Sequence, residues 1–244
     1  MVEWALNEEE NVAAYVDRAG ELLHRVASDF ELILIDDGST DDTWSIVLDL
    51  QRGRPWLKPY RNEGNRGSGY NTKRAIGLAT KDYVFWQTVD WAYDITCLVA
   101  SMWQLDEVDV LQGVRPRTSL VDTIRGRSDN WRKAVVSLGN YYLVRLLFRL
   151  PISDYQNVTV YPSRLLQSIT LESESAFTNV ELLLKTYWLG TRFKEVPAPF
   201  IKRQTGKGTG TRPRELFAAM RDILTWWTQW MLLGRRTSVR RGTV

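Results

Sequence analysis

The sequence predicts an α/β fold in which a mostly parallel β-sheet is covered by helices on both faces. Short apolar runs of strand length alternate along the chain with stretches of helical periodicity, a pattern typical of parallel strands joined by crossover helices. Polar clusters follow two of the apolar runs, after Ile35 and after Val89. Because ligands of such sheets bind at the carboxyl ends of the strands, we expect a binding site at these two clusters.

Local patterns assign the elements in order. ELILIDDG, residues 31–38, is a buried strand that ends at Asp36, and the next helix begins at a polar cap, Thr40 or Asp41. Helices are predicted at residues 11–27, 41–51, 70–79, 95–105, 131–150 and 179–189. Strands are predicted at residues 31–36, 57–60, 82–88, 108–112, 156–161, 192–196 and 200–202. Two basic stretches, 113–130 and 203–212, follow no regular pattern, and long loops of this kind usually have a function.

The last predicted helix begins near Arg214 and is amphipathic. Its apolar face recurs at helical spacing and is rich in tryptophan: Leu216, Met220, Ile223, Trp227 and Trp230. A basic tail follows at residues 235–241. One interpretation is that this helix packs on the core; the other is that it lies in a membrane interface, where tryptophan favours the headgroup layer and arginine meets anionic lipid. We expect one domain over residues 1–212 and the helix with its tail over 213–244.

Composition excludes several classes of protein. The 244 residues are 44% hydrophobic and 25% charged, enough for one sizeable core, and the net charge of +3 gives no reason to expect a nucleic-acid partner. The single cysteine excludes an intrachain disulfide. The single histidine, His24, excludes multi-histidine metal sites and lies in a helical pattern far from any nucleophile motif. No secretory signal or run of ~18 apolar residues is present, so we expect a cytoplasmic protein, either free or peripheral on the cytoplasmic face of a membrane.

Three segments together give a specific signal. They are IDDGSTDDT at 35–43, RNEGNRGSGYNTKRAIGLA at 61–79 and VFWQTVDWAYD at 84–94. Each alone is weak, since Asp-Asp-Gly-Ser is a common polar turn. In this order and spacing they resemble the nucleotide-diphospho-sugar-binding half of the family-two glycosyltransferases, which have the GT-A fold, and most of all the polyprenyl- or dolichyl-phosphate sugar synthases.

The resemblance extends over about residues 5–210. LNEEENV at 6–12 resembles the family's Tyr-Asn-Glu-Glu segment, although the usual Pro and Tyr are missing and the first strand is short. LQGVRPR at 111–117 resembles the family's strand followed by Gly-x-Arg, and residues 137–162 resemble its helix and Asp-containing loop before the acceptor site. Residues 177–208 resemble its Glu-bearing helix, its Glu-Val-Pro turn and its Arg-x-x-Gly-Lys loop.

This resemblance implies roles for individual residues on the donor side. Asp90 corresponds to the second acid of the family's Asp-x-Asp motif, and Thr88 takes the place of the first. Asp36 would contact the base or ribose of the nucleotide, with Asp37 close by. The remaining donor residues would be Asn7 and Glu8 along the nucleotide pocket, with Gly67 and Gly69 letting the main chain approach the donor.

The chemistry of such a donor implies a divalent cation, Mg²⁺ or Mn²⁺. One or two carboxylates and the donor's own phosphates hold the cation, and Asp90 with Asp94 would supply the carboxylates. Thr88 offers a hydroxyl without a charge, so we expect weaker metal binding in the absence of the donor. A metal-independent enzyme, or one that uses Lys and Arg instead, remains an alternative.

The acceptor decides whether a general base is needed. A lipid phosphate is already ionised, so positioning and charge balance suffice. The cationic candidates on this side are Arg115, Arg117, Arg203 and Lys207. A sugar hydroxyl would require a base, with Asp154 the first choice and Glu181 the second.

We therefore expect an inverting glycosyltransferase that moves a sugar from a nucleotide donor to an acceptor at the membrane surface, and the resemblance implies a polyprenyl phosphate as that acceptor. One alternative is a transferase acting on a soluble or saccharide acceptor. The other is a nonenzymatic nucleotide-sugar-binding protein, for which Thr88 would mark a degenerate metal motif.

Overall fold

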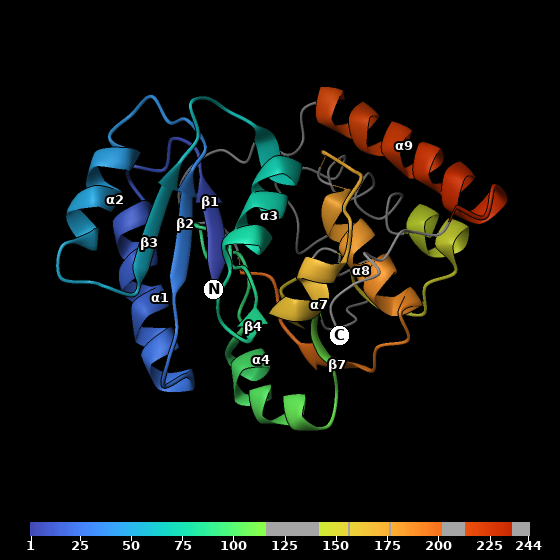
Figure 1. Ribbon diagram of the computed structural model, residues 1–244, viewed down its shortest axis with the longest axis horizontal. Coiled ribbons are helices and arrows are strands. Elements are labelled where there is room, and N and C mark those ends of the chain that lie inside the picture. Colours follow the sequence, from blue (N-terminus) through green and yellow to red (C-terminus); the bar gives the residue numbers. More distant parts are fainter. Residues whose placement is uncertain (116–141, 156, 176, 202–212, 236–244) are drawn as a thin grey trace.

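The structure is a computed structural model that describes residues 1–115, 142–155, 157–175, 177–201 and 213–235, without the side chains of 213–219. Helices and strands alternate along the chain, as Figure 1 shows. The strands are β1 Val2–Ala5, β2 Leu32–Asp36, β3 Leu57–Arg61, β4 Tyr83–Val84, β5 Val110–Val114, β6 Thr159–Pro162 and β7 Phe193–Pro197. The α-helices are α1 Val12–Val26, α2 Thr43–Gln51, α3 Gly67–Leu78, α4 Thr96–Ala100, α7 Ser163–Ser168, α8 Thr178–Trp188 and α9 Pro213–Trp227. A 3₁₀ helix covers Met102–Asp106, a π-helical turn covers Thr228–Leu232, and residues 142–148 are helical.

The strands form two sheets that join into one layer. Strands β1, β2 and β3 are parallel, and the second sheet has the order β4-β6-β5-β7 with β6 antiparallel to both of its neighbours. A parallel bridge between Val2 and Trp86 connects the two sheets, and the Val2 N–H donates to the Phe85 carbonyl at 2.9 Å. The prediction of a mostly parallel sheet is confirmed.

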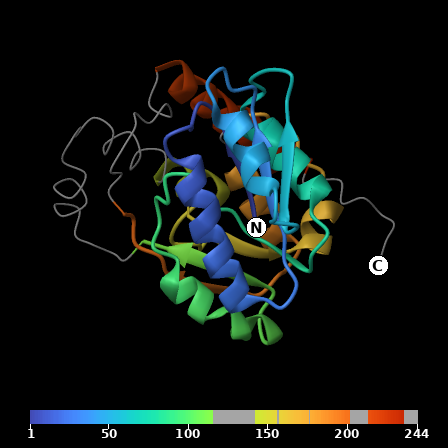
Figure 2. The same ribbon diagram turned by 90° about the vertical axis from the view of Figure 1, so that its left-hand side faces the viewer.

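Strand β2 shows why the sheet must be covered on both sides. All five of its residues are buried. Ile33 and Ile35 face one hydrophobic core, and Leu32 and Leu34 face the other. Helices α1 and α2 lie over one face and α3 over the opposite face, as Figures 1 and 2 show. A continuous apolar run is what a parallel strand buried on both faces requires.

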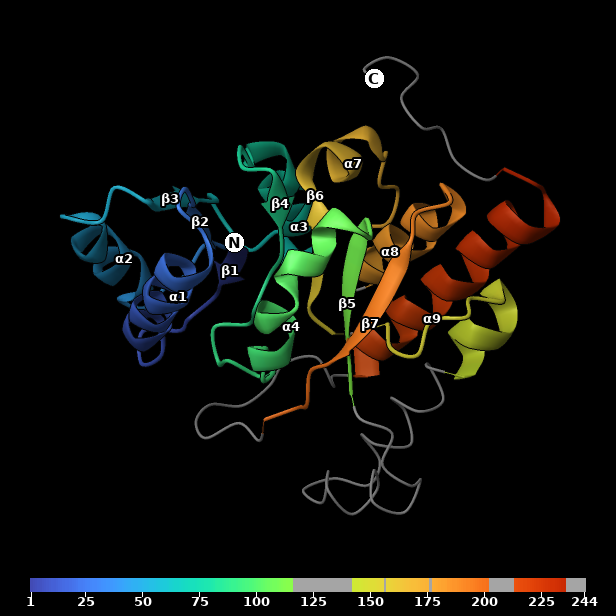
Figure 3. The same cartoon turned by 90° about the horizontal axis from the view of Figure 1, so that it is seen from below.

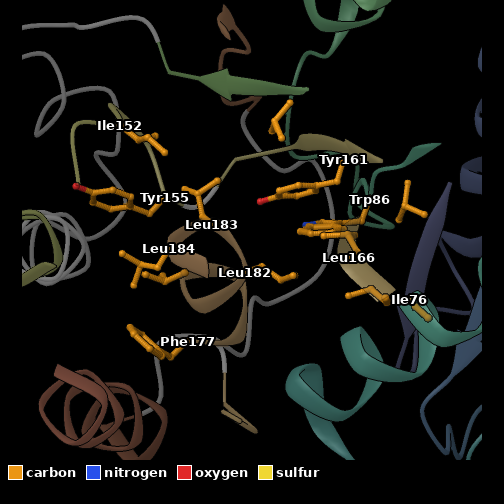
Figure 4. Close-up of a cluster of buried hydrophobic side chains, with 14 of the residues drawn as sticks. Ile76, Trp86, Ile152, Tyr155, Tyr161, Leu166, Phe177, Leu182, Leu183 and Leu184 are labelled. Atoms are coloured by element: carbon orange, nitrogen blue, oxygen red, sulfur yellow. The ribbon is translucent and has the colours of Figure 1, made fainter. Parts of the chain in front are cut away.

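The core beneath α3 extends into the second half of the chain. Side chains from α3, α7 and α8 meet there, together with Trp86 and Tyr161, whose rings stack at 5.8 Å (Figure 4). The core on the other face is formed mainly by α1, by α4 and by the residues around Val89. The carboxyl ends of β1 and β2 therefore rest on packed layers on both sides.

Some predicted boundaries differ from the structure for non-local reasons. The strand predicted at 82–88 pairs regularly only over Tyr83–Val84, and beyond it Trp86 makes only an isolated bridge with Val2. Helix α3 begins at Gly67 rather than at residue 70, and the helix predicted at 95–105 divides at Ser101. Phe200 makes only an isolated bridge with Tyr93, and α7 was not predicted.

Helix α9 packs on the rest of the protein through its tryptophan-rich end. Ile223 and Trp230 are buried in the core beneath α3, and α9 lies on the same side of the molecule as α8 in Figures 1 and 3. The Trp230 ring lies 5.7 Å from that of Trp188 on α8 and 6.1 Å from that of Phe148. Of the two interpretations of this helix, packing on the core accounts for these side chains. Among the described residues, no helix combines the length and apolarity needed to cross a bilayer.

Candidate functional site

The two aspartates that end β2 have different partners. Asp36 is buried, accepts the Ser39 N–H at 3.1 Å and forms an ion pair with Arg61 at 2.9 Å. Arg61, at the end of β3, lies over the ring of Trp44 at 5.6 Å. An acidic and a basic side chain therefore stand together at the carboxyl edge of the sheet, where polar groups of a ligand can be recognised.

Asp37 instead organises the glycine-containing loop before α3. Its carboxylate accepts the main-chain N–H groups of Arg66 at 2.9 Å and Gly67 at 3.0 Å, and the Asn62 side-chain amide at 2.6 Å. These bonds satisfy the first N–H groups of α3 from a loop 30 residues earlier in the chain. Gly38 is required beside it, because its φ is +78° and a methyl group there would lie 2.5 Å from Gly64 Cα.

The end of β1 is joined to the loop after β2. Asn7 has a φ of 54°, and its side-chain oxygen accepts the Thr40 N–H at 2.9 Å. The Asn7 N–H donates to Ser39 Oγ at 3.0 Å, and the Glu8 N–H donates to Thr43 Oγ1 at 2.9 Å. The structure thus brings Asn7 and Glu8 beside the loop that follows Asp36.

Thr88 holds the turn that presents Asp90. The Ala92 N–H donates to Thr88 Oγ1 at 3.0 Å, and the Trp91 N–H donates to the Thr88 carbonyl at 2.7 Å. Trp91 has a φ of 52°, which is unusual for a bulky residue, and Arg18 lies over its ring at 4.3 Å. Asp90 is half-buried within this turn. The hydroxyl at position 88 therefore fixes main-chain geometry beside the acid.

Asp94 has a local structural task. Its carboxylate accepts the Thr96 N–H at 3.0 Å at the start of α4, and hydrogen bonds from Thr96 hold the pKa of Asp94 below its ordinary value. Within the described ranges, no group of three or more His, Cys, Asp or Glu side chains gathers as a metal site. The residues present fit a cation bound jointly by Asp90 and a diphosphate better than one held by the protein alone.

Glu3 on β1 belongs to this region and was missed by sequence reasoning. It is buried, its Oε2 has no hydrogen-bond partner, and burial raises its pKa well above the ordinary value, with smaller contributions from Asp90 and Glu8. The hydroxyl of Tyr15 on α1 is likewise buried without a partner. A signal was available in the sequence, because the strand VEWA places an acid among apolar residues.

We expect Glu3→Gln to stabilise the protein increasingly as the pH rises. Because the pKa of Glu3 is raised in the folded state, the folded protein binds more protons than the unfolded chain above the unfolded pKa, so stability falls as the pH rises. Melting temperatures at pH 5 and pH 8 check this. The gain from Glu3→Gln should be larger at pH 8, and an equal gain at both pH values would contradict a protonation effect.

On the acceptor side, Arg115 and Asp154 form a bidentate ion pair. Arg115 Nε and Nη2 each lie 2.7 Å from an Asp154 oxygen, and the Arg115 N–H also donates to Asp154 Oδ2 at 3.2 Å. Asn157 contributes a further donor to Asp154 at 3.4 Å. Asp154 is buried, whereas part of the Arg115 guanidinium reaches the surface. The ion pair therefore fixes the positively charged guanidinium of Arg115 at the end of β5.

Glu181 on α8 is fully buried and holds the segment before that helix. It accepts the N–H groups of Glu172 at 2.7 Å and Ser173 at 2.8 Å, and it forms an ion pair with Lys185 at 2.6 Å. Both predicted glycines lie in the first turn of α3. Gly67 has a φ of +79° and open space around it, whereas Gly69 packs against the Glu174 main chain. Arg117, Arg203 and Lys207 lie outside the described residues.

Comparison with known proteins identifies the family of this chain. A family model described as glycosyl transferase family 2 matches residues 4–163, more than half of the chain. The chain belongs to glycosyl transferase family 2. The family and the fold predicted from the three motifs are thereby confirmed.

The family-2 relatives are distant and longer. Glycosyltransferase AglD of Haloferax volcanii is 25% identical over 223 residues, which are 89% of this chain and 34% of that protein. The chain spans only between a quarter and about a third of the length of the curated relatives that it matches.

Two solved structures show the same fold. One is glucosyl-3-phosphoglycerate synthase from Mycobacterium tuberculosis with Mn²⁺, UDP and glucosyl-3-phosphoglycerate (TM-score 0.59, 16% identity, 93% of this chain and 77% of that one). The other is mannosyltransferase PcManGT from Pyrobaculum calidifontis with GDP-mannose and Mn²⁺ (TM-score 0.56, 15% identity, 100% of this chain and 75% of that one).

Proposed function

We propose that this family-2 domain is an inverting glycosyltransferase that moves a sugar from a nucleotide diphosphate sugar to a polyprenyl phosphate. The observation that carries the choice of acceptor is the engagement of both candidate bases. Asp154 is held by Arg115, and Glu181 by Lys185 and two main-chain N–H groups. An acceptor hydroxyl would need one of them free, whereas an ionised phosphate needs neither.

The donor would lie across the carboxyl edge of the sheet. Asn7, Glu8 and Asp36 would line the nucleotide pocket, and the open space beside Gly67 would allow close approach of the diphosphate. Asp90 would hold Mg²⁺ or Mn²⁺ together with the phosphates, with Asp94 as a second carboxylate. The two solved structures named above contain Mn²⁺ with UDP or GDP-mannose, which supports a donor of this class. A cation bound there would neutralise charge on the departing diphosphate.

In the proposed reaction, an acceptor phosphate oxygen attacks the anomeric carbon while the bond to the donor diphosphate breaks. The bonding electrons leave with the nucleoside diphosphate, and the anomeric configuration inverts. Arg115, fixed by Asp154, would balance the charge of the incoming phosphate together with Arg117, Arg203 and Lys207. The protein mainly binds and orients two anions, and no proton needs to be removed.

A membrane surface would deliver such an acceptor. Apolar side chains are exposed on the helical residues 142–148, on α9 and on the π-helical turn that follows it: Tyr142, Leu146, Met220, Leu224, Leu232 and, just after the turn, Leu233. Exposed Arg145 and Arg221 lie in these helices, and exposed Arg149 and Arg235 lie just after helical segments. Apolar and cationic groups together favour an anionic bilayer surface, so we propose a peripheral location on the cytoplasmic face.

The test is a panel of nucleotide sugars with and without a divalent cation. A donor that binds the folded state raises the melting temperature by mass action. Transfer is then measured to polyprenyl phosphate in liposomes and to soluble saccharides, with flotation reporting membrane binding. No stabilisation by any nucleotide sugar, or transfer only to a saccharide, overturns the proposal, and full activity in EDTA removes the cation from it.

A further inference from the structure

Residues 170–175, here called the strap, connect three helices that are distant in the sequence. The strap precedes α8, contacts α9 and its π-helical turn, and touches the first turn of α3. None of its residues belongs to a helix or a strand, and an isolated bridge at residue 169 lies just before it. Side chains from the neighbouring helices must therefore hold it in place.

Helix α8 holds the strap through two buried charged side chains, Glu181 and Lys185. Glu181 accepts the Glu172 and Ser173 N–H groups, as described above. Lys185 lies between Glu181 and the strap, donating to the Thr170 carbonyl at 2.7 Å and to Glu172 Oε2 at 2.9 Å. Both charged groups are almost fully buried, and the ion pair with these hydrogen bonds satisfies them.

The C-terminal helices anchor the strap from the other side. Trp230 Nε1 donates to Glu172 Oε2 at 3.2 Å, and Ser173 Oγ donates to Asp222 Oδ2 at 3.2 Å. Trp230 is fully buried and also lies over Lys185 at 5.0 Å. Glu172 therefore contacts both Lys185 on α8 and Trp230 in the π-helical turn after α9.

The strap in turn supports the start of α3. Gly69 lies so close to the Glu174 main chain that a methyl group on it would overlap the Glu174 carbonyl group. Gly69 is only two residues beyond Gly67, whose N–H is held by Asp37. The main chain that would face the donor diphosphate is thus fixed by Asp37 on one side and by the strap on the other.

We infer that the strap sets the position of the first turn of α3, so that Gly69, Glu181 and Trp230 are positioning residues for donor binding. This inference rests on the proposed function, because it assumes that the donor binds at that turn. Gly69 and Glu181 then affect donor binding without touching the substrate, because they hold the main chain of the first turn of α3 in place. It also makes donor affinity depend on the packing of the C-terminal helix.

The first test compares Gly69→Ala with Gly77→Ala. Both glycines lie in α3, but a methyl group at Gly77 meets no atom within 4 Å, so alanine is harmless there. For folded Gly69→Ala protein, we expect the donor Kd and KM to rise about 10-fold or more, with kcat changed much less. The added methyl group would displace the first turn of α3, and part of the binding energy would be spent on restoring its position. Gly77→Ala should leave the Kd unchanged.

A second pair of variants covers the case in which Gly69→Ala does not fold. Trp230→Phe keeps an aromatic ring at this buried position but removes the indole N–H that donates to Glu172. We expect a several-fold rise in donor Kd. Trp226→Phe is its control, since Trp226 stacks on Trp230 at 5.1 Å without a described hydrogen bond to the strap. Donor Kd is measured by calorimetry and the melting temperature by calorimetric scanning.

The outcomes separate this inference from the proposed function. If the wild-type protein binds no nucleotide sugar, the proposed function fails. If the wild type binds a donor and folded Gly69→Ala, or Trp230→Phe in its place, binds it equally well, the inference is overturned. A lower melting temperature with an unchanged donor Kd would show a merely structural strap and would also overturn it.

Discussion

Asp90→Asn is expected to reduce kcat by about 10³-fold at saturating donor and Mn²⁺. The substitution keeps the shape of the side chain and removes its charge from the turn that Thr88 and Trp91 hold. Removing one group that stabilises charge in a transition state typically costs about 10²–10³ in rate, and Asp90 has no acidic partner at position 88 to replace it. Initial rates with a radiolabelled donor measure the loss.

The comparison variant is Asp94→Asn, at the second carboxylate proposed for the cation in the same loop. Its carboxylate is engaged by Thr96 at the start of α4, so we expect less than about a 10-fold loss of kcat from this change, well below that of the Asp90 variant. Equal losses in the two variants would contradict a special role for Asp90. A large loss at Asp94 alone would place the cation on the other side of the loop.

Asp154→Ala is expected to destabilise the protein by about 3 kcal/mol, because it leaves the Arg115 guanidinium without its bidentate partner in a largely buried site. For a chain of this size, that loss lowers the melting temperature by about 6–12 °C. Arg115→Ala should cost a comparable amount, since it leaves the buried carboxylate without its bidentate guanidinium. The double variant should cost little more than either single change, which a double-mutant cycle of denaturant unfolding measures.

The control pair for this cycle is Asp109 with Arg192. These side chains approach to 3.3 Å but are 38% and 66% exposed, so their coupling should be at most about 1 kcal/mol. Similar couplings in the two cycles would contradict the importance of burial. Asp154→Asn separates stability from chemistry: if Asp154 were the general base, this variant would fold and lose all transfer, whereas a positioning role leaves transfer measurable.

The sheet and its helices could be predicted because their signals are local. Strand β2 is apolar up to Asp36, and α1 and α2 carry helical periodicity, so the type and place of each element follow from neighbouring residues. The acidic strand ends were also visible as a motif. Boundaries that depend on distant partners were misplaced, as at α3, whose first turn is stabilised by Asp37.

The functions of individual acids depended on contacts that no local pattern reveals. Asp36 and Asp37 are adjacent in sequence, yet one pairs with Arg61 and the other supports the loop before α3. Asp154 and Glu181 were plausible bases, and the structure surrounds both with donors. Glu3 was overlooked because only the packing of α1 on the sheet makes an acid in β1 a buried one.

By itself, the sequence determined the α/β class, the family and the edge of the sheet at which the acidic motifs gather, because periodicity and motif spacing are encoded in short stretches of chain. The tertiary structure decided which acids are held by neighbouring donors, where the tryptophan-rich helix packs and which segments contact the first turn of α3. Those outcomes depend on hydrogen bonds and burial between residues tens of positions apart, and a side chain's charge, partner and exposure are set only when those segments meet.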